Sequence, residues 1–157
     1  MRYYLLDRIT ELKPPEFARG IKAVSLSEDF LADHFPRYPT MPGALMLESL
    51  AQLSGVLLEK SAQQVYQLEI QSVLSVVERA KFRLLVRPGD VLLLEARVVQ
   101  LREEGGRIQA KAMVGEKTAV SAELLFAFFQ LEDDAVRAEQ RRLIDYWLSP
   151  DAKGLRI

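Results

Sequence analysis

The clearest hydrophobic pattern in the chain is a helical stretch that runs from about Pro42 to Lys60. Apolar side chains cover most of its circumference, which is typical of a helix surrounded by protein. Pro42 suits a first helical turn, because the N–H that proline lacks would have no partner there. One narrow polar stripe interrupts the apolar surface at intervals of four, three and four residues: Glu48, Gln52, Gly55 and Glu59.

On both sides of this helix the spacing changes to that of β-strands. Residues 2–10 are aromatic and apolar and predict a short helix or strand, and alternation predicts a strand at 20–26. After the helix, strands are expected over 70–77, 82–86, 91–100, 108–114 and 120–130. Turns are expected at 103–106, where paired glycines would supply positive φ, and at 115–117.

Residues 132–148 predict a second, amphipathic helix. Its expected apolar side consists of Ala135, Ala138, Leu143, Tyr146 and Trp147. One apolar helix followed by a run of antiparallel strands predicts an α+β fold, in which the sheet wraps around the long central helix. A chain of 157 residues is expected to form a single domain, 1–157, with 132–157 as a C-terminal helical extension.

Composition argues against several classes of function. A formal net charge of −1 does not favour nucleic-acid binding, which uses a strongly basic face. One histidine and no cysteine argue against a zinc site and exclude a thiol nucleophile. The N-terminus lacks a basic-then-apolar signal segment, and the central helix carries Glu48 and Gln52, which does not favour a membrane span. A soluble, cytoplasmic protein is therefore expected.

The single histidine, His34, opens a short loop that leads into the central helix. Pro36, Pro39 and Pro42 restrict the backbone of this loop and bias the residues before them towards extended conformations. Such a loop can present an imidazole at a defined place. Because Glu48 follows fourteen residues later on the apolar helix, the two side chains are a candidate acid–base pair.

The segment that contains this pair resembles a known enzyme family. HFPRYPTMPGALMLESLAQ, at 34–52, closely follows the pattern HFPxxPxMPGxLxxExxAQ of the 3-hydroxyacyl-acyl-carrier-protein dehydratases of the FabZ/FabA type. Shorter likenesses extend the match to roughly residues 3–131: YYLLDRI at 3–9, AKFR at 80–83, RPGD at 87–90 and AELLFA at 122–127. The resemblance implies a hot-dog fold. It also implies dehydration of (3R)-hydroxyacyl-acyl-carrier-protein to the trans-2-enoyl thioester in fatty acid biosynthesis.

By this resemblance His34 would be the base that removes the C2 proton, and Glu48 would assist departure of the C3 hydroxyl, directly or through water. The N–H of Gly43 would donate to the thioester oxygen at the helix N-terminus, and Gln52 would orient Glu48. Each residue also has a plainer interpretation. His34 would be a packed histidine, Glu48 and Gln52 part of a solvated stripe, and Gly43 a glycine needed only for packing.

The resemblance further implies a homodimer, in which His34 of one subunit faces Glu48 of the other, and trimers of such dimers. No cofactor or metal is expected, since the substrate itself carries phosphopantetheine. The partner would be an acidic acyl carrier protein, attracted by basic residues near the site. The candidates for carrier docking are Arg37, Arg79, Lys81, Arg83 and Arg87, although an ordinary charged strand is the alternative.

Two residues of the loop depart from the family pattern. Asp33 and Arg37 stand where the family usually has glycine, so substrate preference or activity is expected to differ. The rival functions are a non-catalytic hot-dog protein that binds acyl thioesters and a hot-dog thioesterase in which Glu48 activates water. Intact His34 and Glu48 within the motif favour dehydration over both.

Overall fold

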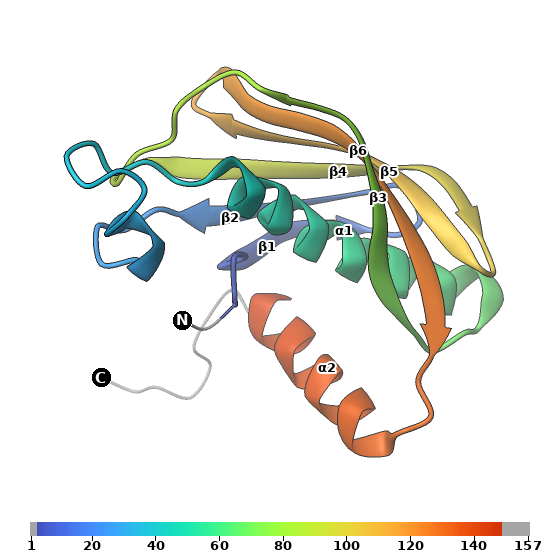
Figure 1. The fold of residues 1–157 in the computed structure, drawn as a ribbon. Helices are drawn as coiled ribbons and strands as arrows, with labels where there is room; N and C mark the ends of the chain where they lie inside the picture. Colours follow the sequence, from blue (N-terminus) through green and yellow to red (C-terminus); the bar gives the residue numbers. More distant parts are fainter. Residues whose placement is uncertain (1–2, 149–157) are drawn as a thin grey trace.

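The computed structural model describes residues 3–148, so residues 149–157 of the expected C-terminal extension lie outside it. Six antiparallel strands form one sheet in the order β1-β2-β4-β5-β6-β3, which curves around helix α1 (Figure 1). This is the expected α+β hot-dog arrangement. The elements are β1 (Arg8–Lys13), β2 (Phe17–Ala23), the short 3₁₀ helix η1 (Asp29–Leu31), α1 (Gly43–Tyr66), β3 (Ile70–Phe82), β4 (Val91–Arg102), β5 (Gly105–Val114), β6 (Lys117–Gln130) and α2 (Asp134–Leu148).

A row of alanines crosses the middle of the sheet. Ala18 of β2 pairs with Ala96 of β4, Ala96 pairs with Ala110 of β5, and Ala110 pairs with Ala122 of β6. All four are buried. Because alanine presents only a methyl group, the row leaves space for the large side chains of the helix that the sheet surrounds.

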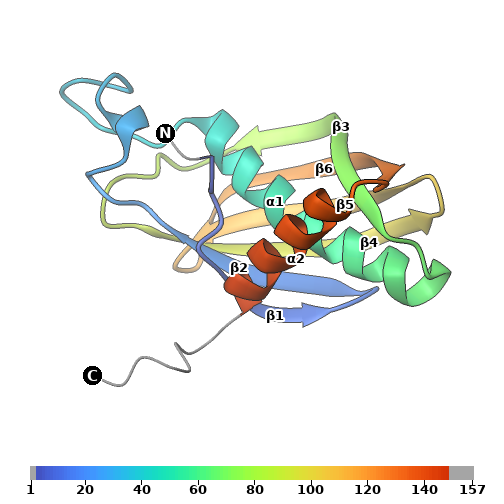
Figure 2. The same ribbon diagram turned by 90° about the horizontal axis from the view of Figure 1, so that it is seen from below.

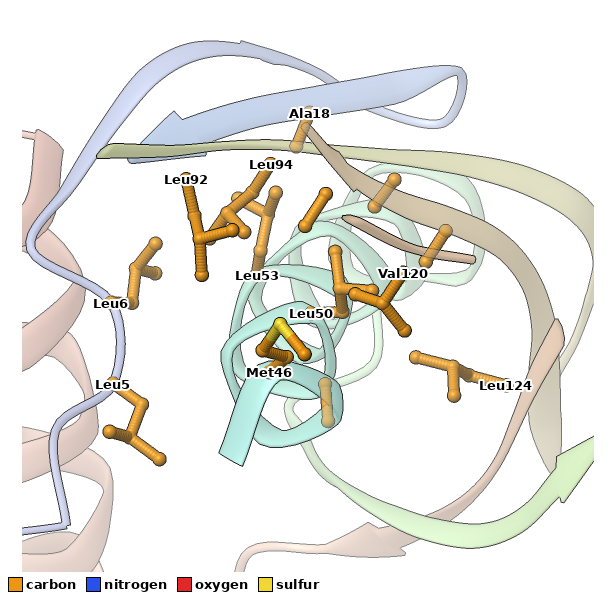
Figure 3. Packing of buried hydrophobic residues seen from close by; sticks show 14 of the residues in the cluster. Leu5, Leu6, Ala18, Met46, Leu50, Leu53, Leu92, Leu94, Val120 and Leu124 are labelled. Atoms are coloured by element: carbon orange, nitrogen blue, oxygen red, sulfur yellow. The ribbon is translucent and has the colours of Figure 1, made fainter. Parts of the chain in front are cut away.

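The core lies between this face of the sheet and α1 (Figure 3). Leu50, Leu53 and Leu57 of α1 are fully buried, as expected for a helix surrounded by protein. Their counterparts on the sheet are large aliphatic side chains that flank the alanine row: Leu92, Leu94, Val120 and Leu124. Burying each such side chain contributes roughly 1.5–3 kcal/mol, so this layer fixes the position of α1.

β3 is one strand, where two separate strands at 70–77 and 82–86 were expected, and residues 83–86 do not form a strand. Its pairing with β6 shifts register between Leu74 and Val76 and again between Glu78 and Lys81. Arg79 has a positive φ of 52° at the second shift. Such bulges insert residues that break simple alternation, which explains why the sequence pattern divided the strand.

Other boundaries also differ from the sequence prediction. α1 continues to Tyr66, because no proline or glycine interrupts it after Lys60, and it ends where Gln67 adopts a left-handed conformation. β2 begins at Phe17, which pairs with β4, and stops before residue 24. The N-terminal segment forms a strand only from Arg8 onwards.

The glycines expected to supply positive φ in the β4–β5 turn are instead required by close packing. Gly105 and Gly106 belong to β5, and the described glycines with positive φ are Gly89 and Gly115. A Cβ at Gly105 would collide with the backbone carbonyl of Phe126, and one at Gly106 would collide with the side chain of Leu58. These two positions therefore lack side chains because strand and helix pass too close to them.

Helix α2 lies on the side of α1 that faces away from the sheet (Figures 1 and 2). Ile144 and Trp147 are its buried residues, and the Trp147 ring meets Tyr4 edge-on at 6.4 Å. The expected apolar side was partly wrong, because Ala135, Ala138 and Tyr146 are exposed. No helix within residues 3–148 is long and apolar enough to cross a membrane.

Glu59 joins α1 to the start of β3. Its Oε1 accepts hydrogen bonds from the Ser72 backbone N–H at 3.0 Å, from the Ser72 hydroxyl at 2.9 Å and from the Gln71 amide at 3.1 Å. Burial raises the pKa of Glu59 from its ordinary value of 4.5 to about 7, although the hydrogen bonds from Ser72 act in the opposite direction. This carboxyl therefore titrates near neutral pH.

The raised pKa of Glu59 predicts a pH-dependent stability. Between about pH 4.5 and 7 the folded state holds a proton that the unfolded state has lost, so the free energy of unfolding should fall as pH rises through this window. Glu59→Gln should lack this part of the slope in urea denaturation at a series of pH values. Glu116→Gln, at an exposed turn residue, is the control and should keep the wild-type slope. Equal slopes for wild type and Glu59→Gln would contradict the prediction.

Candidate active site

The loop that carries His34 is closed by backbone hydrogen bonds. Phe35 and Tyr38 bond to each other through both backbone groups, with N···O distances of 3.3 and 2.9 Å, and Thr40 N–H donates to the His34 carbonyl at 2.7 Å. Arg37 lies inside the tight turn that results and is exposed, as is Asp33 before it. The loop therefore presents the imidazole from a compact turn.

The imidazole of His34 is oriented by the same loop. Its Nδ1 lies 2.7 Å from the carbonyl oxygen of Thr40. A carbonyl oxygen can only accept, so Nδ1 carries the hydrogen and, in the neutral ring, Nε2 keeps its lone pair. The buried Thr40 is itself held, because its hydroxyl donates to the Tyr38 carbonyl at 3.0 Å. The arrangement leaves Nε2 as the basic atom of the site.

Glu48 lies in the second turn of α1, beside Gln52. The Gln52 amide donates to Glu48 Oε1 at 3.0 Å and to the Tyr3 carbonyl at 2.9 Å. Its own oxygen accepts from Leu5 N–H at 2.9 Å. Gln52 is thus fixed by the N-terminal segment and fixes Glu48 in turn, which is the contact expected from the sequence.

The structure does not bring His34 and Glu48 together within one chain. Across residues 3–148, no hydrogen bond or ion pair joins the two side chains. Glu48 instead lines a cavity of about 740 Å³ between α1, β3 and α2, whose described lining does not include His34. Within the described chain, the two side chains therefore do not line one common cavity.

Gly43 is the first residue of α1 and is in close contact with a phenylalanine. A Cβ added there would lie 2.7 Å from Cε1 of Phe82. Packing alone thus accounts for a glycine at this position, the alternative that the sequence left open. In the described chain no side chain caps this helix N-terminus, so its first N–H groups are free of side-chain acceptors.

Three of the basic residues predicted for carrier docking have hydrogen-bond or ion-pair partners in the described chain: Arg79, Arg83 and Arg87. Arg79 forms an ion pair with Glu123 at 3.2 Å. Arg83 donates to the Ser121 hydroxyl at 2.8 Å.

Arg87 extends to the loop of His34. Its guanidinium donates to the Tyr38 hydroxyl at 3.2 Å and lies 5.5 Å from the centre of that ring. Arg37 and Lys81 are exposed. Arg37 therefore belongs to the loop and Arg87 contacts it, whereas Arg79 is paired with a carboxylate.

Two features of the site were not evident from the sequence. Thr40 fixes the tautomer of His34 through its backbone carbonyl, a group that every residue has, so its side chain gives no signal. The involvement of Tyr3 and Leu5 through their backbone is hidden for the same reason. Among residues 3–148 no cluster of three or more histidine or carboxylate side chains could hold a metal ion.

Solved structures share the fold. The dehydratase heterocomplex ApeI:P from Xenorhabdus doucetiae gives a TM-score of 0.67 at 16% identity, covering 91% of this chain and 90% of that one. A thioesterase from Haemophilus influenzae gives a TM-score of 0.58 at 13% identity and covers 79% of each chain. At such low identities the likeness establishes the fold alone, and it does not separate dehydratases from thioesterases.

Sequence comparison identifies the family. The 3-hydroxyacyl-acyl-carrier-protein dehydratase FabZ of Levilactobacillus brevis is 44% identical over 134 residues, which are 84% of this chain and 88% of that protein. The FabZ of Legionella pneumophila strain Lens is 41% identical over 125 residues, or 80% and 83% of the two chains. A sequence model described as a FabA-like domain matches residues 1–123. The chain therefore belongs to the FabA-like family.

Proposed function

We propose that this protein dehydrates (3R)-hydroxyacyl-acyl-carrier-protein to trans-2-enoyl-acyl-carrier-protein in fatty acid biosynthesis. Membership of the FabA-like family and the names of the relatives support this reaction. The observation that carries the mechanism is the His34 ring, whose Nδ1 is bound to the Thr40 carbonyl so that Nε2 is left as a base.

In this mechanism His34 Nε2 removes a proton from C2, and the resulting electron pair forms the C2–C3 double bond as the C3–O bond breaks. Glu48 gives a proton to the departing hydroxyl, which leaves as water. The Gly43 N–H at the start of α1 stabilises charge on the thioester oxygen. The elimination passes no electrons to an acceptor, so it requires no redox cofactor, and the phosphopantetheine belongs to the substrate.

The complete site is proposed to form in a homodimer. β3 is an edge strand of the sheet, and its Val73, Val76 and Val77 remain 40–45% exposed. Phe35 and Phe82 beside the loop are also about half exposed. Pairing two β3 edges would cover these apolar groups, and the family resemblance implies that His34 of one subunit then faces Glu48 of the other. The family resemblance also implies trimers of such dimers.

Carrier docking is proposed to use Arg37, Lys81, Arg83 and Arg87, which are exposed around the loop and the end of β3. Arg79 is a weaker candidate because Glu123 already pairs with it. Acyl carrier protein as the partner and a cytoplasmic location remain predictions from the sequence and the relatives.

The proposed reaction is tested directly by incubation with a 3-hydroxyacyl carrier thioester, followed by the mass of the product. Loss of one water supports dehydration. Loss of the acyl group would instead indicate the thioesterase, and an unchanged mass would indicate the non-catalytic binding protein. Either of these two results would overturn the proposal.

The catalytic pair makes a first prediction. His34→Ala and Glu48→Gln should each lower kcat for dehydration by about 10²–10⁴-fold, because each removes a proton-transfer group, and circular dichroism should show an unchanged fold. Glu116→Gln is the control and should retain wild-type activity. Near-normal turnover by either folded variant of the pair would exclude this mechanism.

A second prediction concerns the shared site. Neither His34→Ala nor Glu48→Gln subunits should be active alone, but mixed dimers should regain activity, since one composite site would contain an intact His34 and an intact Glu48. The measurement is activity of dimers assembled from a mixture of the two variants. Mixtures of His34→Ala with a His34→Ala/Glu48→Gln double variant serve as the control and should stay inactive. An active monomer in sedimentation would contradict the shared site.

A third prediction concerns carrier docking. Arg37→Glu and Arg83→Glu should raise KM for the carrier-bound substrate and leave turnover of a small pantetheine thioester nearly unchanged, because long-range attraction acts on encounter. Added salt should slow only the carrier-bound reaction, since the Debye length is about 8–10 Å. Arg102→Glu, separated from Arg87 by the length of β4, is the matched control. Equal salt dependence for both substrates would show that these residues are an ordinary solvated surface.

A further inference from the structure

The loop of His34 is buried at one end and exposed at its turn. Thr40 and Met41 are buried, whereas Phe35 and Tyr38 are 54% and 48% exposed. The exposed turn also contacts the imidazole, because the Phe35 ring stacks on the His34 ring with the ring centres 4.3 Å apart. An exposed turn opens easily unless another segment of the protein holds it.

Tyr38 connects the exposed turn to the imidazole. Its carbonyl accepts hydrogen bonds from the Phe35 N–H at 3.3 Å and from the Thr40 hydroxyl at 3.0 Å. The Thr40 carbonyl in turn lies 2.7 Å from His34 Nδ1. A displacement of Tyr38 would therefore disturb both groups that contact the His34 ring, which are the Phe35 ring and the Thr40 carbonyl.

The side chain of Tyr38 is held by Arg87. The guanidinium donates to the Tyr38 hydroxyl at 3.2 Å and lies over the ring, 5.5 Å from its centre. A charged donor strengthens the hydrogen bond, and the electrons of the ring attract the same cation. Tyr38 stands at a position that the pattern HFPxxPxMPG leaves variable, so the family pattern does not account for this contact.

Arg87 projects from a turn that is fixed to its surroundings. Its backbone N–H donates to the Asp90 carboxylate at 2.8 Å, and the Asp90 N–H donates to the Arg87 carbonyl at 3.0 Å. The turn is also tied to the residue after β2, because the Gly89 N–H donates to the Val24 carbonyl at 2.9 Å and the Val24 N–H donates to the Asp90 carbonyl at 3.0 Å. The guanidinium therefore extends from a fixed backbone and can restrain the exposed loop beside it.

We propose that Arg87 is a positioning residue for the base of the reaction. It holds Tyr38, and through Tyr38 and Thr40 it keeps the His34 ring in the orientation that leaves Nε2 free. The inference rests on the proposed function, in which this Nε2 removes the C2 proton. The role differs from the carrier docking proposed for Arg87, because it acts within the chain and applies equally to a substrate without a carrier protein. A ring that is correctly placed for part of the time is active for that part only, so loss of the contact lowers kcat.

The kinetic test uses a 3-hydroxyacyl pantetheine thioester, which removes any effect of carrier docking. Arg87→Leu and Tyr38→Leu should each lower kcat about tenfold and leave KM nearly unchanged, because each removes one cation–π contact and one charged hydrogen bond from the loop. Both side chains are exposed, so neither variant should unfold the protein. The double variant should be no less active than either single variant, since all three lack the same contact.

Arg97→Leu is the matched control for the kinetic test. Its guanidinium lies 5.1 Å from the centre of the Phe17 ring, at the opposite end of β2 from Val24, and this variant should retain wild-type kcat. An unchanged kcat in Arg87→Leu would overturn the inference. Effects of Arg87→Leu and Tyr38→Leu that multiply in the double variant would overturn it as well.

Nitrogen NMR of the tag-free protein separates this inference from the proposed reaction. His34 is the only histidine in the chain, so a single pair of imidazole resonances reports its tautomer. Above the pH range in which histidine titrates, the wild type should show a protonated Nδ1 and an unprotonated Nε2. In Arg87→Leu and in Tyr38→Leu the two nitrogen shifts should move towards each other as both tautomers become populated, whereas Arg97→Leu should keep the wild-type shifts.

The NMR outcomes distinguish the two proposals. Wild-type shifts in folded Arg87→Leu would overturn the positioning role, whatever the activity of the protein. Altered shifts in this variant of a protein that does not dehydrate the substrate would overturn the proposed reaction and leave the contact between Arg87 and the His34 loop supported.

Discussion

The close approach of α1 to the sheet is the constraint on which the rest of the structure depends. It is possible because Ala18, Ala96, Ala110 and Ala122 lie side by side across four strands. Small side chains on the sheet let the leucines of α1 fill the space at native packing density, and larger residues would cost roughly 1–3 kcal/mol each in strain. With the helix held in this way, the side of α1 that faces away from the sheet is presented in a fixed orientation.

That outward side carries the polar stripe, so the packing of the helix decides where its chemistry lies. Glu48 and Glu59 are both on it, but their surroundings differ. Glu48 is held by Gln52, which is itself tied to the backbone of Tyr3 and Leu5. Glu59 is enclosed by the start of β3, and burial raises its pKa. One surface of a single helix thus holds two carboxyl groups with different hydrogen-bond partners.

Much of this architecture could be predicted from the sequence, because periodicity reports burial. The central helix, the three strands that follow β3 and the placement of Gln52 one turn after Glu48 all follow from spacing. Errors occurred where the backbone departs from regular pairing. The bulges of β3 near Arg79 divided one strand into two in the prediction, and the glycines at 105 and 106 serve close packing rather than positive φ. Contacts between segments that are far apart in the sequence determine both features, so the local hydrophobic pattern cannot predict them.

The same distinction explains which parts of the site the sequence could identify. His34 and Glu48 stand out because they are unusual residue types within a loop and an apolar helix. The tautomer of His34, in contrast, is set by the backbone carbonyl of Thr40, and every residue type has such a group. The sequence also does not show that these two side chains lie apart in the folded chain. His34 is held by a loop closed on itself, and Glu48 by a helix fixed in the core, so neither can move far toward the other without breaking the contacts that orient it. The loop and the helix thus orient the two side chains independently, and the contacts that position one do not position the other.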